Sequence, residues 1–338
     1  MHPPSKTFAK VMRDRQLAWA RDGNLTDGVL EERHGKLSWV LKRTHQRSNL
    51  FLDEWWTHIA GREHRWARAL NSSQCFAVNL FGPLAKNNER ARRALQRLLP
   101  SRVIGLDDTI SVEFEFTPPG ARDWLGEKGQ PTQIDVYFKI ERSGQCVGHV
   151  LVEVKFTETG FGCCRGWKGK SRGQWLNPDR ARCRNVSAIV ANPKVNCWLA
   201  SPQGEARRYW EIISRPDSSL RESAIRAAGE CPFRYGLYQM MRNRLLGDEL
   251  VRHTRASWAD FIVCHHPDNK AILELEEAVS VNSDAVTAFR SLSSDDSVHV
   301  WNAADVVEKI RSIDNQLATW ESWMHKRYFD SGTVLALK

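Results

Sequence analysis

Three residues that can bind a metal ion or stabilise a phosphate lie on two neighbouring runs of alternating hydrophobic and polar residues. Asp135 belongs to the run IDVYFKI, and Glu153 and Lys155 belong to the run VLVEVKF. A hydrophobic residue at every second position is typical of a β-strand with one buried face. The residues SGQ between the runs are typical of a tight turn, so the sequence predicts a β-hairpin that carries all three residues.

The register of this hairpin brings the two carboxylates together. If the turn is centred on Gly144, Asp135 pairs with Glu153, and Lys155 lies one step further along the same face. Like charges in a cross-strand pair are unfavourable unless positive charge lies between them. Lys155 supplies part of that charge, and a divalent cation would supply the rest. Mg²⁺ prefers carboxylate oxygens and keeps waters for substrate phosphates, so we expect Mg²⁺ or Mn²⁺ at Asp135 and Glu153.

These residues resemble the signature of the PD-(D/E)xK nuclease superfamily, which has the restriction-endonuclease-like fold. The resemblance rests on Asp135 and on VEVKF, which contains Glu153 and Lys155, although Ile134 stands where the signature has proline. It implies that both carboxylates bind Mg²⁺. It also implies that Lys155 either helps to activate the attacking water or stabilises the charge that develops on the phosphate.

Further segments resemble a poorly characterised prokaryotic branch of the same superfamily and together cover most of residues 71–264. In nuclease relatives a helical Gln/Tyr element lies beside the metal, which implies catalytic roles for Tyr238 and Gln239. Arg242 adds positive charge nearby. The matching segments are SSQCFAVNLFGPL, PTQID, VEVKFTETGFG and CPFRYGLYQMMRN.

Residues 109–117 alternate in the same way and predict a strand beside the one that carries Asp135. Phe114 and Phe116 would share its buried face with Ile110 and Val112. Glu113 and Glu115 would lie on the opposite face, where either residue could join the metal site. An exposed strand face is the alternative interpretation.

The expected fold class is α/β, with a restriction-endonuclease-like mixed central sheet, flanking helices and a cysteine-bearing insertion. We expect a mainly helical N-terminal region at residues 1–100 and a nuclease core at residues 101–265, which includes the insertion at residues 161–231. Residues 266–338 are expected to form a C-terminal extension. The predicted helices are at residues 50–70, 88–99, 233–246 and 301–328, and a further core strand is predicted at residues 258–265.

The charge balance favours a polyanionic partner, because Lys and Arg outnumber Asp and Glu by 49 to 40. Lys168, Lys170 and Arg172 alternate with tryptophans in a glycine-rich loop, which suits contact with a nucleic-acid backbone. Arg242 is a further candidate for this contact. The arginines of residues 90–97 either contact phosphate as well or form a solvated helix face.

The chain contains eight cysteines, and four of them, Cys164, Cys183, Cys197 and Cys231, lie around the insertion. The segment between them is expected to be poor in core residues, and its first part is rich in Gly, Arg and Lys. Without a signal peptide, the thiols are expected to be reduced or to bind metal. Their scattered spacing leaves two interpretations, which are isolated buried cysteines or one four-thiolate site for Zn²⁺ or a [4Fe-4S] cluster. Some exonuclease branches of the resembled superfamily hold this region with an iron-sulfur cluster.

Together these features predict a Mg²⁺-dependent DNA endonuclease that acts in restriction, defence or DNA processing. One alternative is a nucleic-acid-binding subunit with a vestigial metal site, and another is a nuclease for RNA or branched DNA. The N-terminal residues lack the apolar segment of a signal peptide, and no apolar run is long enough to span a membrane. We therefore expect a cytoplasmic protein with DNA as its partner, and a homodimer remains open.

Overall fold

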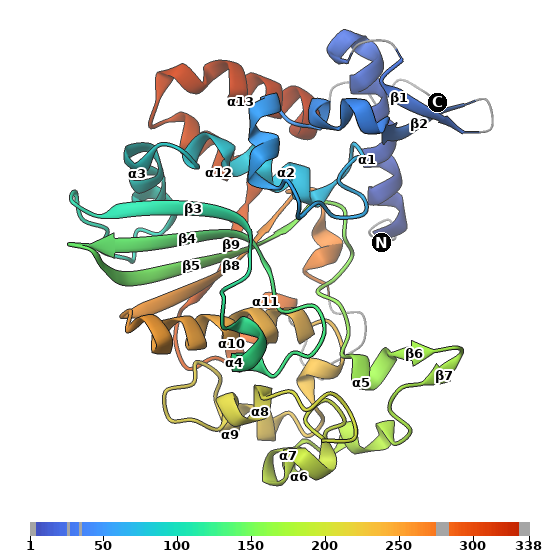
Figure 1. Cartoon of the computed structure of the whole chain (residues 1–338), viewed down its shortest axis with the longest axis vertical. Coiled ribbons are helices and arrows are strands. Elements are labelled where there is room, and N and C mark those ends of the chain that lie inside the picture. The colour runs from blue at the N-terminus through green and yellow to red at the C-terminus, as the bar shows by residue number, and fades with distance from the viewer. Residues whose placement is uncertain (1–4, 26–27, 34–35, 275–283, 331–338) are drawn as a thin grey trace.

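A computed structural model of the chain describes residues 5–25, 28–33, 36–274 and 284–330, and its centre is one five-stranded sheet (Figure 1). The strands in spatial order are β3 (Thr109–Phe116), β4 (Ile134–Arg142), β5 (Gln145–Lys155), β8 (Trp258–His265) and β9 (Val298–Asn302). β4 is antiparallel to β3 and β5, whereas β8 is parallel to β5 and β9. This mixed sheet with helices on both faces confirms the predicted α/β class.

β4 and β5 form the predicted hairpin. Its register at the end near Asp135 and Glu153 is the predicted one. Its two-residue turn is Ser143-Gly144, with φ values of 50° and 77°, which is the backbone conformation that such a turn requires. A bulge follows the turn, and beyond it the ladder continues to the pair of Val136 and Val152. Asp135 and Glu153 are the next residues along the two strands, as the predicted register requires.

One face of the sheet packs against helices from both ends of the chain, and we call this the first core. Val136, Phe138 and Val152 contribute from the sheet. Trp320 donates a hydrogen bond from its indole Nε1 to the carbonyl oxygen of Asn79 at 2.8 Å. The N-terminal and C-terminal regions therefore share one core. The covering helices are α2 (Ser73–Phe81), α3 (Asn88–Leu98), α12 (Ala303–Arg311) and α13 (Ala318–Met324) (Figure 1).

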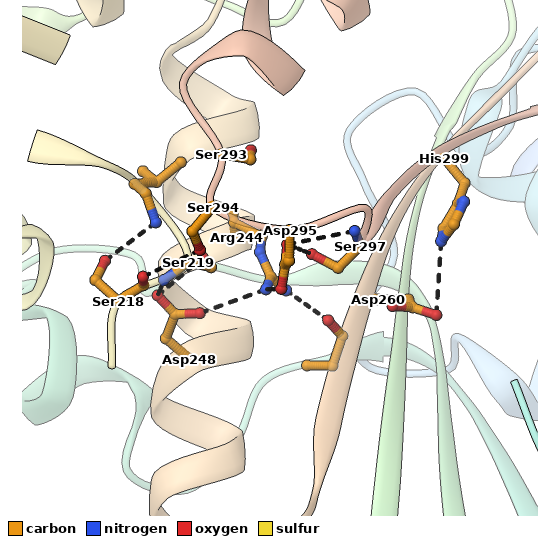
Figure 2. A network of polar contacts seen from close by, with 12 residues as sticks. Ser218, Ser219, Arg244, Asp248, Asp260, Ser293, Ser294, Asp295, Ser297 and His299 are labelled. Atoms are coloured by element: carbon orange, nitrogen blue, oxygen red, sulfur yellow. Dashed lines mark hydrogen bonds and ion pairs between the residues drawn. The ribbon is translucent and has the colours of Figure 1, made fainter. Parts of the chain in front are cut away.

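The opposite face packs against α10 (Tyr238–Thr254), α4 (Ala121–Leu125), α8 (Tyr209–Ile213) and α11 (Ala285–Ser291), and we call this the second core. A polar network holds α10 against the sheet (Figure 2). Arg244 donates from Nη1 to the carbonyl oxygen of Ala259 on β8 at 2.6 Å, and its Nη2 lies 3.3 Å from Asp295 Oδ2. Asp248 accepts from the backbone N–H and the hydroxyl of Ser219, both at 3.0 Å. These contacts fix the helix that carries Gln239.

The insertion at residues 161–231 is built from short elements. Its hairpin of β6 (Lys170–Ser171) and β7 (Gln174–Trp175) projects away from the sheet and its helices (Figure 1). Tyr209, Trp210 and Ile213 enter the second core. The expectation of few core residues is therefore wrong for the second half of the insertion. The other elements are α5 (Arg165–Lys168), α6 (Val186–Ala191), α7 (Pro193–Asn196) and α9 (Glu222–Ala227).

The structure differs from three of the predicted helices. The helix predicted at residues 233–246 is α10 at Tyr238–Thr254, which starts later and ends later. Residues 50–70 contain a 3₁₀ helix (Asp53–His58) and turns, one of which requires Gly61 with a φ of 77°. Residues 301–328 begin in β9 and then divide into α12 and α13, because Asp314 accepts the backbone N–H of Gln316 at 2.9 Å and starts a new turn. None of the described helices is long and apolar enough to cross a membrane. The N-terminal elements are α1 (Ser5–Trp19), β1 (Leu30–Arg33) and β2 (Lys36–Leu41).

Candidate active site

The structure brings together Asp135, Glu153 and Lys155 at one end of the β4–β5 hairpin. Asp135 accepts the backbone N–H of Val154 through Oδ2 at 2.7 Å. The Lys155 Nζ lies 2.7 Å from Glu153 Oε1. Glu153 and Lys155 are only 2 % and 6 % exposed, whereas Asp135 is half-buried. The three side chains therefore form one cluster that solvent reaches mainly at Asp135.

Helix α10 supplies two amides that hold Glu153. Gln239 donates from Nε2 to Glu153 Oε1 at 2.7 Å, and its Oε1 accepts from Lys155 Nζ at 3.0 Å. Asn243 donates from Nδ2 to Glu153 Oε2 at 2.7 Å. Residues four apart on a helix lie on the same face, which explains why both amides reach the same carboxylate. Asn243 was not predicted from the sequence, although its spacing from Gln239 is a signal that could have identified it.

Tyr238 and Arg242 lie on another face of α10, because successive helical residues point about 100° apart. The guanidinium of Arg242 lies over the Tyr238 ring, 5.6 Å from its centroid. Arg242 Nε also donates to Glu127 Oε1 and Thr132 Oγ1, both at 3.1 Å. Arg242 therefore supports the segment that leads into β4. The predicted roles of Tyr238 beside the metal and of Arg242 in DNA contact stay predictions.

Glu115 is the third carboxylate of the cluster. β3 pairs with β4 on both sides of it, so Glu115 faces Asp135, and its side chain is buried. Glu113 is exposed and pairs with Tyr137, which decides between the two predicted candidates. Glu115 has a φ of 51°, a left-handed conformation that is unusual for this residue type.

The left-handed conformation of Glu115 also interrupts the alternation of β3. Phe116 stacks on the ring of Tyr137 with centroids 3.9 Å apart, and it packs against the second core. Phe114 remains in the first core. The prediction that Phe114 and Phe116 share one face is therefore wrong. The physical reason is the backbone rotation at Glu115, which is not apparent from the sequence pattern.

His64 completes the cluster from the segment that was predicted to be helical. Its Nε2 lies 3.1 Å from Glu115 Oε2. Gln74 of α2 holds this segment, because its Oε1 accepts the backbone N–H of His64 at 2.9 Å and its Nε2 donates to the carbonyl oxygen of Arg62 at 3.0 Å. The sequence contains no spacing signal for His64, since its approach to Glu115 depends on tertiary packing.

The cluster has a surplus of negative charge. Burial and the carboxylates of Glu153 and Glu115 raise the pKa of Asp135 well above its usual value, although Lys155 opposes this shift. A hydrogen bond with Glu115 raises the pKa of His64. An ionised Asp135 therefore lacks enough positive charge around it, and a cation at this position would relieve the imbalance.

Lys155 stays protonated in this setting. Burial would lower its pKa, but the negative charges of Glu153, Glu158 and Asp135 outweigh burial and raise the pKa above the usual value of lysine. Lys155 therefore acts as a fixed positive charge at neutral pH. A group that holds its proton this firmly is a poor general base.

The donor atoms of the cluster fit a hard divalent cation. Carboxylate oxygens are the preferred ligands of Mg²⁺ and Mn²⁺. Within the described ranges, no three His, Cys, Asp or Glu side chains are already arranged as a metal-binding group. Mg²⁺ is commonly held by one or two carboxylates and keeps several waters, so Asp135 and Glu153 are a sufficient pair of protein ligands.

The predicted basic residues lie on α5 and on the projecting hairpin. Lys168, Lys170 and Arg172 are exposed. Lys170 Nζ and the Arg180 guanidinium lie 4.0 Å and 3.7 Å from the ring centroid of Trp175. Both cations therefore make cation–π contacts with Trp175.

The α3 arginines are the second set that was predicted to contact phosphate. Two of them form ion pairs within the protein. Arg90 pairs with Asp314, with Nε 3.1 Å from Oδ2. Arg92 is buried and pairs with Glu89. Arg93 and Arg97 remain exposed.

The four cysteines around the insertion are all buried and lie near one another, although they are far apart in the sequence. Cys164, Cys197 and Cys231 belong to the second core, and the backbone N–H of Cys231 donates to the carbonyl oxygen of Cys183 at 2.9 Å. Cys164, Cys183, Cys197 and Cys231 are all reduced thiols.

A comparison with known proteins identifies the family. A family profile described as Restriction Endonuclease associating with ARP matches residues 21–329, which include every residue of the cluster. No curated protein matches this chain, and no solved structure matches it either. The fold, with its mixed sheet and flanking helices, is consistent with a restriction-endonuclease-like protein. Because the match extends over most of the sequence, the chain belongs to the family described as Restriction Endonuclease associating with ARP.

Proposed function

We propose that this protein is a Mg²⁺-dependent nuclease that hydrolyses phosphodiester bonds in DNA. The observation that carries the proposal is the ammonium group of Lys155 at 2.7 Å from Glu153 Oε1, next to Asp135, which accepts the backbone N–H of Val154 between these two residues at 2.7 Å. Two facing carboxylates and a fixed positive charge are the groups that metal-assisted phosphodiester hydrolysis uses. Membership of a restriction-endonuclease family supports the same reaction class.

Each residue has a distinct role in this proposal. Asp135 and Glu153 would hold Mg²⁺, which polarises a phosphoryl oxygen and lowers the pKa of a bound water when it is present. Lys155 stabilises the negative charge that develops on the phosphate, and its raised pKa favours this role over that of a general base. Gln239 and Asn243 orient Glu153.

The projecting hairpin is the proposed contact with DNA. Its tip is Arg172-Gly173, with φ values of 48° and 82°, and Lys170 lies at the start of its first strand. The segment that leaves β5 after Lys155 leads through Phe161 to α5 and this hairpin, and Lys155 Nζ lies 5.8 Å from the Phe161 ring centroid. A short segment of the chain that borders Lys155 therefore connects the site to the hairpin.

The hairpin shape favours duplex DNA as the substrate. The major groove of B-form DNA admits a two-stranded β-ribbon, whereas the major groove of duplex RNA is too deep and narrow for side chains to read. Cations on such a ribbon can reach phosphates on both sides of the groove.

Cleavage assays on the full chain test this proposal. The substrates would be supercoiled and linear duplex DNA, single-stranded DNA and duplex RNA, each with Mg²⁺ or with EDTA. We expect Mg²⁺-dependent cleavage of duplex DNA that is lost in Glu153→Ala and Lys155→Ala. Glu113→Ala is the matched control, because Glu113 is an exposed carboxylate on the neighbouring strand. Equal cleavage by all four proteins would refute the assignment of the site, and preferential cleavage of duplex RNA would refute the substrate.

A further inference from the structure

Four thiols from separate parts of the insertion occupy one buried region. Cys164, Cys183, Cys197 and Cys231 are between 6 and 9 % exposed. A Cβ atom placed on Gly166 would lie 3.5 Å from the Cys164 sulfur and 3.6 Å from the Trp198 ring, so Cys164 borders the residue that follows Cys197. Burial raises the pKa of Cys164, and the charges of all three other cysteines add to this effect. Each thiol is therefore a near neighbour of the others.

Burial raises the pKa of each of the four thiols, but backbone N–H groups near three of them act to lower it. These groups are Gly166 for Cys164, Leu199 and Ala200 for Cys197, and Phe233 and Arg234 for Cys231. The N–H groups of Ala200 and Arg234 donate to the carbonyl oxygens of Cys197 and Cys231 at 3.0 and 3.3 Å, so these turns fold closely around the cysteines. N–H groups close to a sulfur favour a thiolate over a neutral thiol.

A buried guanidinium beside the thiols has two nitrogens without a hydrogen-bond partner in the described structure. Arg234 is 6 % exposed, and its Nε and Nη1 atoms find no hydrogen-bond partner among the described residues, although Nη2 pairs with Glu230. Buried polar groups are normally satisfied, so two unpaired nitrogens call for a neighbouring negative charge. The positive charges of Arg234 and Arg180 act to lower the pKa of Cys183, although its burial raises it. Thiolates at this position would accept hydrogen bonds from the Nε and Nη1 atoms of Arg234.

The first part of the insertion has little else to stabilise it. Among residues 165–184, only Gly166, Asn177 and Cys183 are buried. A segment that buries so little apolar surface cannot offset the entropy lost on ordering. A metal bound only by the folded form would supply the missing stabilisation.

We propose that Cys164, Cys183, Cys197 and Cys231 bind a structural metal centre as four thiolates, either one Zn²⁺ or an iron-sulfur cluster. In the zinc case four thiols each lose a proton to solvent as four Zn–S bonds form, and the resulting net negative charge is offset by Arg234 and Arg180. In the described structure the sulfurs are not yet arranged around one point, so binding draws them inward. Four thiolates leave no open position, which makes the centre structural rather than catalytic.

Metal analysis of the anaerobically purified full chain tests this proposal. One zinc per chain with no visible colour identifies Zn²⁺, and iron with a broad visible absorbance identifies a cluster. We expect Cys183→Ala and Cys231→Ala to lose the metal. Cys163→Ala and Cys264→Ala are the matched controls and should keep it, since Cys163 adjoins Cys164 in sequence and Cys264 is buried in the first core.

A second measurement covers the case in which the variants do not fold. Chelation of the metal from the wild-type protein should lower its Tm, and the metal content of Asp135→Asn should equal that of the wild type. The proposal is wrong if the folded wild-type protein contains no zinc or iron and takes up neither on reconstitution. It is also wrong if Cys183→Ala and Cys231→Ala retain the full metal content.

Discussion

Asn243 donates its side-chain amide to Glu153 at 2.7 Å, so the carboxylate is oriented before any metal binds. Gln239 holds the other carboxylate oxygen from the preceding turn of α10. The helix is in turn fixed to β8 through Arg244 and Ala259. The orientation of a proposed metal ligand therefore depends on a chain of contacts that ends at Ala259 on β8.

Removal of this amide should weaken the site without removing a ligand. We expect Asn243→Ala to lower Mg²⁺ affinity or the cleavage rate by about 10- to 100-fold, which is the usual effect of losing a group that orients a metal ligand. Titration of cleavage against Mg²⁺ measures the change. Arg252→Ala, at an exposed position on the same helix, is the control. A rate and an affinity equal to those of the wild type would show that Glu153 needs no support from α10.

Replacement of Asp135 should stabilise the metal-free protein. The pKa of Asp135 is raised in the folded state, so its ionisation removes stability as pH rises from the unfolded value toward the folded value. Each unit of such a shift costs about 1.4 kcal/mol. We expect Asp135→Asn to raise the Tm in EDTA at neutral pH and to abolish cleavage.

The same variant should no longer respond to Mg²⁺. Wild-type protein gains stability from a bound ion by mass action, about 2.7 kcal/mol at one hundred times the Kd. Asp135→Asn should show little or no rise in Tm when Mg²⁺ is added, measured by thermal melts with and without the ion. A lower Tm in EDTA combined with a normal response to Mg²⁺ would contradict both expectations.

His64 should make Mg²⁺ binding depend on pH. Its pKa is raised by Glu115, so the ion pair stabilises the fold at low pH and is lost as pH rises through the raised folded value. Loss of the positive charge leaves Glu115 unbalanced next to Asp135, which should strengthen Mg²⁺ binding. We expect wild-type affinity to increase between about pH 6 and 8 and this component to disappear in His64→Gln. An identical pH profile for both proteins would show that His64 does not influence Mg²⁺ binding.

The hairpin should account for part of the salt dependence of DNA binding. Each lost phosphate contact reduces the slope of log affinity against log salt by about 0.9. We expect the double variant Lys170→Ala, Arg172→Ala to flatten the slope by up to about twice that amount, as measured by binding titrations over a range of salt concentrations. The double variant Arg93→Ala, Arg97→Ala is the control, because both residues are exposed on α3. If the Arg93/Arg97 variant flattens the slope and the Lys170/Arg172 variant does not, the DNA-binding surface lies on α3.

Local patterns in the sequence predict the β4–β5 hairpin, and the observed register agrees with the prediction up to the pair of Val136 and Val152. Alternation of apolar residues and the short turn are local signals. The two-residue turn alone would put Asp135 opposite Val152, and the bulge between Ile140 and Glu141 shifts the strands into the predicted register. The β8 strand was predicted with its observed bounds for a similar reason, since Trp258–His265 is a short apolar run between polar segments. Local patterns are therefore sufficient to predict strands whose formation depends on neighbouring residues in the sequence.

Tertiary packing selects which further groups approach Asp135 and Glu153. Glu115 is a candidate from strand alternation and Asn243 has helical spacing from Gln239, but no pattern in the sequence relates His64 to either residue. The left-handed backbone at Glu115 reverses the local alternation, and Cys183 meets Cys231 through the folding of the insertion. The physical reason is the same in each case. These contacts are set by how the two cores pack against the sheet, which no local periodicity of the chain encodes.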